Sequence, residues 1–446
     1  MHLSRRTFLL SAANAAAFSL AGAPAWSRAA PPVIRVNAAR LREHIERLSE
    51  FGRPPGGGFA EGVTRVGYSD ADLAGRGYVL QLMKAAGLET RIDAAANIIG
   101  RRPGAGAASK PIVFGSHVDS VPSGGNFDGP LGTLAAIEVA QTLFERGLTT
   151  GHPLEVVAWT NEEGVAYGNG LCGSRAAAGE LVPGELDQVW NGVRKADAVR
   201  TLGGDPDRIA DARRAPGSIH AYLELHIEQG GVLDRAGVPI GVVEGIVAID
   251  RYECSVRGAV NHAGTTPMPD RHDALLAASR LVQAVNEIVT REPGRQVGTV
   301  GRLDVTPNAP NVVPGLVRMT VELRDLSAEK LVRLAGGVRA RADEIAAATG
   351  TTIELTRSSH HEAALADPGV RAAIAQSADD LGFAHVSLPS GAGHDAQMLA
   401  RLGPMGMVFV PSIGGISHSP RERTSWDDCS RGADVLLRSV LAVDRL

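Results

Sequence analysis

The sequence predicts an α/β protein with a mostly parallel sheet flanked by helices, into which a smaller ferredoxin-like α+β domain is inserted. Two observations lead to this fold class. From residue 37 to about residue 245, short apolar runs alternate with longer segments of helical periodicity. From residue 246 to 354 the order of the segments changes, and motifs that resemble a functional site resume at Ser390.

Three segments of the first region show the alternation clearly. Residues 111–115 form an apolar run typical of a buried strand, residues 131–146 have a helical pattern, and residues 154–160 form a second strand-like run. In open, mainly parallel sheets, ligands bind beyond the carboxyl ends of the strands. We therefore expect functional side chains directly after these strands.

The region 246–356 predicts a second, smaller sheet. Its segments follow the order strand, helix, strand, strand, helix, strand, which is typical of a ferredoxin-like domain. These segments are residues 249–256, 274–289, 297–305, 317–323, 331–348 and 352–355. We expect a catalytic domain formed by residues 31–245 and 357–446, with residues 246–356 as a dimerisation or lid domain inserted between them.

Residues 1–30 predict a twin-arginine signal peptide. The pair Arg5-Arg6 precedes an apolar, alanine-rich stretch, and residues 23–25 offer small side chains for cleavage. We expect a protein exported to the periplasm or beyond, without a membrane segment in its mature form. The net charge of −4 gives no basic surface for nucleic acid.

Several polar side chains follow the predicted strands of the larger region. His117 ends the first strand, and Asp119 can hold its ring through the other ring nitrogen. Asp128 lies in a Gly-rich turn before a helix, where a helix cap is the alternative interpretation. Glu162 and Glu163 follow the next strand. They are either solvated charges or a metal ligand beside a general base.

Two more histidines complete a possible metal site. His226 lies in an alternating run, where a buried core histidine is an equal alternative, and His418 lies in a loop after the apolar strand 407–410. Three imidazoles with two or three carboxylates suit Zn²⁺, Mn²⁺, Co²⁺ or Ni²⁺. The three cysteines lack the short spacing of structural zinc sites, so we expect buried thiols, with one disulfide left open.

With two further motifs, the sequence resembles the hydantoinase/carbamoylase group of the M20 metallopeptidase family. The motifs are HAGTTPM at residues 262–268 and SGAGHDA at residues 390–396, and the similarity runs from about residue 40 to the C-terminus. This group includes N-carbamoyl-L-amino-acid hydrolases, β-ureidopropionase and allantoate amidohydrolase. The resemblance implies an amidohydrolase that cleaves the ureido C–N bond of an N-carbamoyl amino acid or related ureido acid. Allantoate, a peptide substrate, and a metal-dead exported binding protein are the alternatives.

The resemblance also implies two divalent ions per subunit and a role for each ligand. His117 and His226 would hold one ion and Glu163 and His418 the other, with Asp128 bridging the pair. Glu162, next to one ligand, would be the general base. The peptide bond after Asp128 is expected to be cis, as in related enzymes.

The remaining roles concern the substrate and a second subunit. His262 would act in the active site of a partner subunit, within a homodimer formed through residues 246–356. Asn311 and Arg324 would grip the substrate carboxylate, although a turn residue and a surface charge are the alternative interpretations. The residues implied to contact substrate are Gln229, Asn311, Arg324, Gly391, Ala392 and Gly393.

Overall fold

The computed structural model describes residues 34–107 and 110–446. The predicted signal peptide at residues 1–30 lies outside the described residues, so export stays a prediction. Within the described part of the chain, no helix is both long and apolar enough to cross a membrane.

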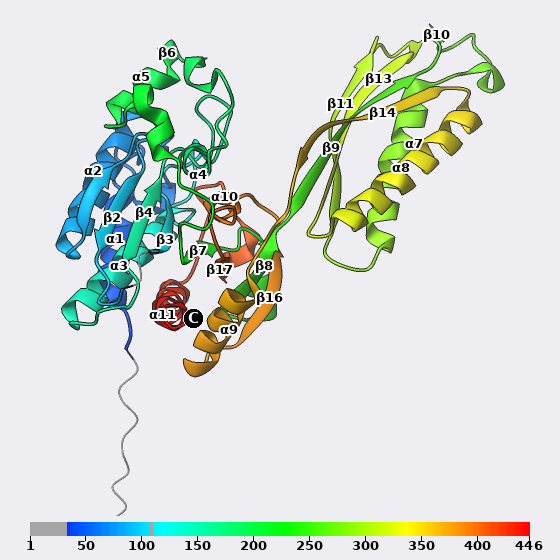
Figure 1. Ribbon diagram of the computed structural model, residues 1–446. Coiled ribbons are helices and arrows are strands. Elements are labelled where there is room, and N and C mark those ends of the chain that lie inside the picture. The colour runs from blue at the N-terminus through cyan, green and yellow to red at the C-terminus, as the bar shows by residue number, and fades with distance from the viewer. Residues whose placement is uncertain (1–33, 108–109) are drawn as a thin grey trace, which may run out of the picture. The chain divides into compact units, whose positions relative to one another are not determined.

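The larger sheet has nine strands in the order β1-β2-β4-β3-β7-β17-β8-β15, and β16 pairs with β8 (Figure 1). The adjacent strands β4, β3, β7 and β17 are parallel to one another. These four strands are buried at every position, as expected for strands covered on both faces. The strands are β1 (Glu89–Ile92), β2 (Ile98–Arg102), β3 (Ile112–His117), β4 (Leu154–Trp159), β7 (Ala221–Ile227), β8 (Ile240–Ile246), β15 (Ala364–Leu365), β16 (His385–Ser390) and β17 (Met405–Val410).

Helices cover both faces of this sheet. Adjacent residues of a strand point to opposite faces, and on β7 Leu225 faces Gly432 of α11 whereas Glu224 accepts a hydrogen bond from Ala396 N of α10. The helices are α1 (Ala38–Leu48), α2 (Asp70–Ala85), α3 (Pro130–Glu145), α4 (Cys172–Ala178), α5 (Lys195–Thr201), α6 (Val232–Ala236), α9 (Pro368–Asp380), α10 (Asp395–Leu399) and α11 (Trp426–Val443). The predicted α/β fold class with a mainly parallel sheet is confirmed.

The smaller sheet has four antiparallel strands in the order β11-β13-β9-β14. Helices α7 and α8 pack on it, and Tyr252, Cys254 and Val256 of β9 alternate with more exposed neighbours, because only one face is covered. Its elements are β9 (Ala248–Arg257), α7 (Ala274–Arg291), β11 (Val297–Thr306), β13 (Leu316–Asp325), α8 (Ala328–Thr349) and β14 (Thr352–His361). All six predicted segments are confirmed in the ferredoxin-like order, and the domain boundaries stay a prediction.

The short strands β10 (Asn261–His262) and β12 (Val312–Val313) pair with each other beside this sheet. The three cysteines, Cys172, Cys254 and Cys429, are free thiols and buried. The possible disulfide is therefore absent from this structure.

Candidate metal centre

The five predicted metal ligands lie at the carboxyl ends of neighbouring parallel strands or in the loops that follow them. His117 is the last residue of β3, and His226 is the second-last residue of β7. Asp128 lies in the turn before α3, and Glu163 follows β4. His418 lies in the loop between β17 and α11. Because β3, β4, β7 and β17 run in the same direction, their ends meet at one edge of the sheet.

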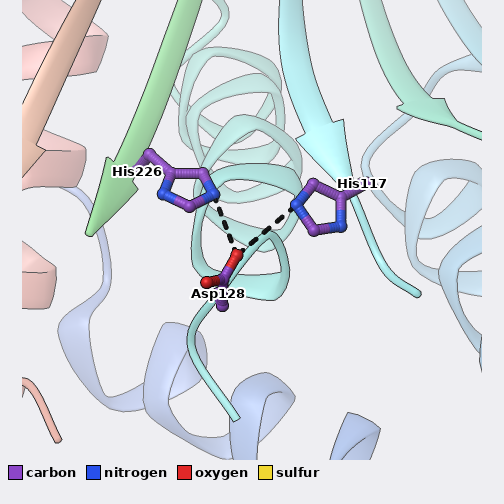
Figure 2. Close-up of side chains that lie close together, drawn as sticks. All are labelled: His117, Asp128 and His226. Atoms are coloured by element: carbon purple, nitrogen blue, oxygen red, sulfur yellow. Dashed lines mark ion pairs between the residues drawn. The ribbon is translucent and has the colours of Figure 1, made fainter. Parts of the chain in front are cut away.

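Two histidines face one oxygen of Asp128 (Figure 2). Asp128 Oδ1 lies 3.6 Å from His117 Nε2 and 3.3 Å from His226 Nε2. The other nitrogen of each ring, Nδ1, is 3.0 Å from Asp119 O and 2.9 Å from Ile227 O. A main-chain carbonyl accepts only, so each Nδ1 carries a proton, and Nε2 is the nitrogen that each ring offers as a ligand when it is neutral. His226 Nε2 also lies 3.2 Å from Gly129 N, which donates to it.

The other oxygen of Asp128 faces the second set. His418 Nε2 is 3.4 Å from Asp128 Oδ2 and 3.4 Å from Glu163 Oε2. Glu163 Oε1 is buried and has no hydrogen-bond partner among the described residues. One carboxylate thus presents one oxygen to each set, which is the arrangement that a bridging ligand requires.

These residues fit divalent cations. The nitrogen–oxygen separations of 3.3–3.6 Å are too long for good hydrogen bonds. Within the described ranges, Asp128, Glu162 and Glu163 form ion pairs only with histidines. Buried carboxylates are costly without compensating positive charge. The chain supplies little of that charge here. Three groups of nitrogen and oxygen ligands could bind ions that supply the rest, and two of these groups share Asp128.

The excess of carboxylates shifts the pKa values of the centre. Burial raises the pKa of Glu162 well above its usual value, and the nearby Asp395 adds to this effect. Burial also raises the pKa of Glu163 to about 7. The close approach of the Asp128 carboxylate raises the pKa of His418 to about 9. For His117, burial alone would lower the pKa, but Glu162 and the other carboxylates outweigh it.

The cavity at the centre has a volume of about 230 Å³. Gln229 is placed to contact a ligand there, because its Nε2 donates to Asp128 Oδ2 at 2.6 Å while its buried Oε1 has no partner among the described residues. Arg324 donates to Gly391 O at 2.6 Å. The cavity is lined by Asp128, Glu162, Glu163, Leu171, His226, Gln229, Ala392, Gly393, His394 and His418.

The structure does not bring Asn311 and Arg324 together. Asn311 O accepts a hydrogen bond from Ala263 N, next to His262 on β10. Arg324 lies near the opposite end of β13, where it pairs with Ile249 of β9. The strand from Leu316 to Arg324 rises about 3.4 Å per residue, on the order of 27 Å in all. Asn311 and Arg324 of one chain therefore do not grip one carboxylate in this structure.

Two details differ from the sequence predictions, and the alternative interpretation of Asp128 as a helix cap does not hold. The carbonyl of Asp119 holds the His117 ring, while its carboxylate accepts from Glu162 N and Glu163 N, each at 3.2 Å. The predicted cis bond after Asp128 is wrong for this structure, since the described cis bond is Thr306–Pro307. Asp128 is not the cap of α3, whose N-cap is Gly129 without a side-chain bond.

Sequence reasoning missed residues that complete the site. His394 stands in the quoted motif at 390–396 but received no role, and its ring meets that of His226 edge to face at 4.5 Å between centroids. Leu171 lines the cavity but carries no chemical signal that a motif would reveal. Glu422, four residues after His418, accepts from Asp128 N at 3.1 Å. Its nearness to the His418 motif was the available signal.

Comparisons with known sequences identify the protein family to which the chain belongs. Residues 113–442 match the family described as Peptidase family M20/M25/M40, and the chain belongs to this family. It is 41% identical to an N-carbamoyl-L-amino acid amidohydrolase of Geobacillus stearothermophilus, covering 91% of this chain and 98% of the relative. It is 36% identical to the allantoate amidohydrolase of Escherichia coli (strain K12), covering 89% and 95%.

Solved structures give the same grouping. A hydantoinase/carbamoylase family amidase from Burkholderia multivorans superposes with a TM-score of 0.84 at 36% identity, covering 92% of this chain and 99% of that chain. The predicted resemblance to the hydantoinase/carbamoylase group is thereby confirmed.

Proposed function

We propose that this protein is a metal-dependent amidohydrolase that cleaves the ureido carbon–nitrogen bond of N-carbamoyl amino acids or closely related ureido acids. The products would be ammonia, carbon dioxide and the free amino acid. The proposal depends on one observation: the two carboxylate oxygens of Asp128 face two separate sets of candidate metal ligands beside Glu162. Relatives that cover nearly the whole chain and are named amidohydrolases support the reaction class.

We propose that two divalent ions bind per subunit, one at His117 and His226 and the other at Glu163 and His418, with Asp128 shared. When bound, such ions polarise the carbonyl of a substrate and make water nucleophilic near neutral pH. The identity of the ions is proposed only as Zn²⁺, Mn²⁺, Co²⁺ or Ni²⁺, which this ligand set suits.

The protein's own residues would move the proton and hold the substrate. Glu162 lines the cavity and is free of the ligand sets, so it would accept the proton of the attacking water and return it to the leaving nitrogen. Gln229 Oε1 has no partner among the described residues and would accept a ureido N–H. Ala392 and Gly393 also line the cavity, and Arg324, which donates to Gly391 O, would bind the substrate carboxylate.

A second candidate substrate is allantoate, which is itself a ureido acid. The similarity to the enzyme of Escherichia coli named allantoate amidohydrolase favours it as an alternative. Both substrates combine a ureido group with a carboxylate, so the groups named above would serve either one. We further propose that the protein acts as a homodimer through the smaller sheet and is exported by the twin-arginine route.

The test is a substrate panel. Purified protein, loaded separately with Mn²⁺ and Zn²⁺, is given N-carbamoyl-L- and D-amino acids, allantoate and dipeptides, and the release of ammonia or amine is measured. We expect ammonia from an N-carbamoyl amino acid and none after EDTA treatment. Higher kcat/KM on allantoate would favour the second candidate. Cleavage of dipeptides alone would contradict the proposal.

A further inference from the structure

Glu422 joins the two loops that carry metal-ligand candidates. It lies in the loop before α11, and its side chain is fully buried, with 0% exposure. Glu422 Oε1 accepts from Phe127 N at 2.9 Å and from Asp128 N at 3.1 Å, and Oε2 accepts from Ser417 Oγ at 2.9 Å. One carboxylate therefore ties the turn of Asp128 to the loop of His418.

Ser417 extends this link to the side chain of Asp128. Its Oγ is 2.7 Å from Asp128 Oδ2, the oxygen that faces His418. Glu422 thus holds the main-chain N–H of Asp128 directly, and the Ser417 hydroxyl, whose single proton can be donated to one carboxylate at a time, lies within hydrogen-bond distance of both side chains.

The glycine at position 125 leaves space for the Glu422 carboxylate. A Cβ on Gly125 would lie 2.0 Å from Glu422 Oε1, so a larger residue at position 125 would displace the carboxylate. The hydrogen-bond partners of the Glu422 carboxylate in the described part of the chain are main-chain N–H groups and one hydroxyl, with no lysine or arginine. Burying a carboxylate without a cation is costly. A negative group in this place is better explained by the neighbouring cation site than by loop packing alone.

We propose that Glu422 is a positioning residue that holds Asp128 and His418 in the relative positions needed to bind one of the two ions. The inference rests on the two-metal function proposed above. His117 and His226 lie on strands, whose geometry the sheet fixes, whereas Asp128, Glu163 and His418 lie on loops. Loss of Glu422 should therefore weaken the ion held by the second set and spare the ion held by the two strand histidines.

The experiment measures Mn²⁺ binding to metal-free full-length protein by isothermal titration calorimetry, together with the visible spectrum of the Co²⁺ form. The variants are Glu422→Gln, which keeps the size, and Ser417→Ala, which removes one hydroxyl. The control is Glu138→Gln, because Glu138 of α3 is also buried and accepts from the main-chain N–H of Asn37 at 2.9 Å; it differs in also pairing with Arg40 at 2.7 Å, away from the candidate ligands.

We expect two ions in the wild type and in Glu138→Gln. In Glu422→Gln, one ion should bind about 10–100-fold more weakly, the range found when a partner of a metal ligand is removed. The other ion should be little changed, and the Co²⁺ spectrum of the weakened site should shift. Ser417→Ala should act in the same direction, and it decides the matter if Glu422→Gln fails to fold.

Two results would overturn the inference. Two ions bound as tightly as in the wild type, in both Glu422→Gln and Ser417→Ala, would show that the link does not position the site. Equal weakening in Glu138→Gln would assign the effect to general loss of a buried carboxylate. Binding of a single ion by the wild type would instead contradict the two-metal function itself, and the inference with it.

Discussion

At the scale of single residues, neighbouring glutamates occupy different environments although they share one turn. Glu163 Oε2 faces His418 at 3.4 Å, whereas Glu162 Oε2 faces the ring of His117 at 3.7 Å. The Asp119 carboxylate holds the main-chain N–H of both residues. These two hydrogen bonds fix the main chain of the turn, so the two side chains can take separate roles.

This difference predicts opposite outcomes for two matched variants. Glu162→Gln should lower kcat by roughly 10²–10⁴, the usual contribution of a positioned proton shuttle, because the amide cannot accept the proton. Its metal content, measured by mass spectrometry of the purified protein, should stay near that of the wild type. Glu163→Gln should lower the metal content. The reverse pattern would mean that the two roles are exchanged.

The site residues that sequence could predict are those whose chemistry is unusual at a strand end. A histidine or a pair of glutamates directly after an apolar run is a visible signal, and His117, Glu162 and Glu163 were found in that way. Glu422 gave only the weaker signal of its nearness to His418, because a glutamate in a polar loop usually is a solvated charge. Its burial depends on contacts with residues about 300 positions earlier in the chain, Phe127 and Asp128. The sequence does not display contacts of that range.

At the scale of elements, the turn before α3 depends on one glycine. Gly129 has φ +78°, and a Cβ there would lie 2.3 Å from His117 Cε1. Gly168 has a similar φ of +72° but no atom within 4 Å of an added Cβ. Gly129 also has ψ −56°, outside the left-handed helical region, so its backbone conformation and its contact with the candidate ligand both add to the cost of a side chain there.

We expect Gly168→Ala to lower the free energy of unfolding by about 1–2 kcal/mol, the usual cost of an L-residue in the left-handed region. Gly129→Ala should cost more and should also reduce metal content, because the His117 ring must move. Urea unfolding and metal analysis check both variants. Equal stability and full metal content in the two variants would show that the turn can adjust.

The first turn of α2 predicts a pH dependence. Asp72 is 1% exposed, and burial raises its pKa to about 6 despite the nearby Arg76. Between pH 3.8 and about 6 the unfolded chain has released a proton that the folded protein retains, so the wild type loses stability as pH rises through this window. Above about pH 6, the decrease in the free energy of unfolding that is attributable to Asp72 reaches about 3 kcal/mol.

The variant Asp72→Asn lacks the carboxyl group that titrates between pH 3.8 and about 6. The stability of the wild type relative to this variant should therefore fall as the pH rises from below 4 to 7, measured by urea unfolding of the metal-free proteins in EDTA. Asp70→Asn, an exposed residue of the same turn, is the control for charge at the start of the helix. A difference between wild type and Asp72→Asn that stays constant with pH would contradict the raised pKa.

The elements themselves were largely predictable, because hydrophobic periodicity is a local property. The buried run at residues 111–115 and the alternation in residues 249–256 correspond to β3 and β9. The strand order could not be derived in the same way. The pairing of β7 with β17 joins segments about 180 residues apart, and nothing in either strand's own pattern selects the other as its neighbour.

At the scale of the whole molecule, the candidate substrate groups fall into two sets. Glu162 lines the cavity and Arg324 contacts Gly391 beside it, whereas His262 and Asn311 lie together at the β10–β12 pair. His262 Nδ1 accepts from Gly264 N and Thr265 N, so its neutral ring carries the proton on Nε2. That N–H is a donor suited to a developing oxyanion.

A homodimer through the smaller sheet would let His262 and Asn311 of one subunit complete the site of the other, since a two-fold interface exchanges equivalent residues. This arrangement predicts complementation groups. His262→Ala mixed with Glu162→Gln should regain activity after subunit exchange, and so should Asn311→Ala mixed with Arg324→Ala, because each mixed dimer then contains one complete site. His262→Ala with Asn311→Ala should stay inactive, and so should Glu162→Gln with Arg324→Ala. Exchange is verified by mass spectrometry of differently tagged subunits. Recovery in either of the last two mixtures, or none in the first two after verified exchange, would contradict a shared site.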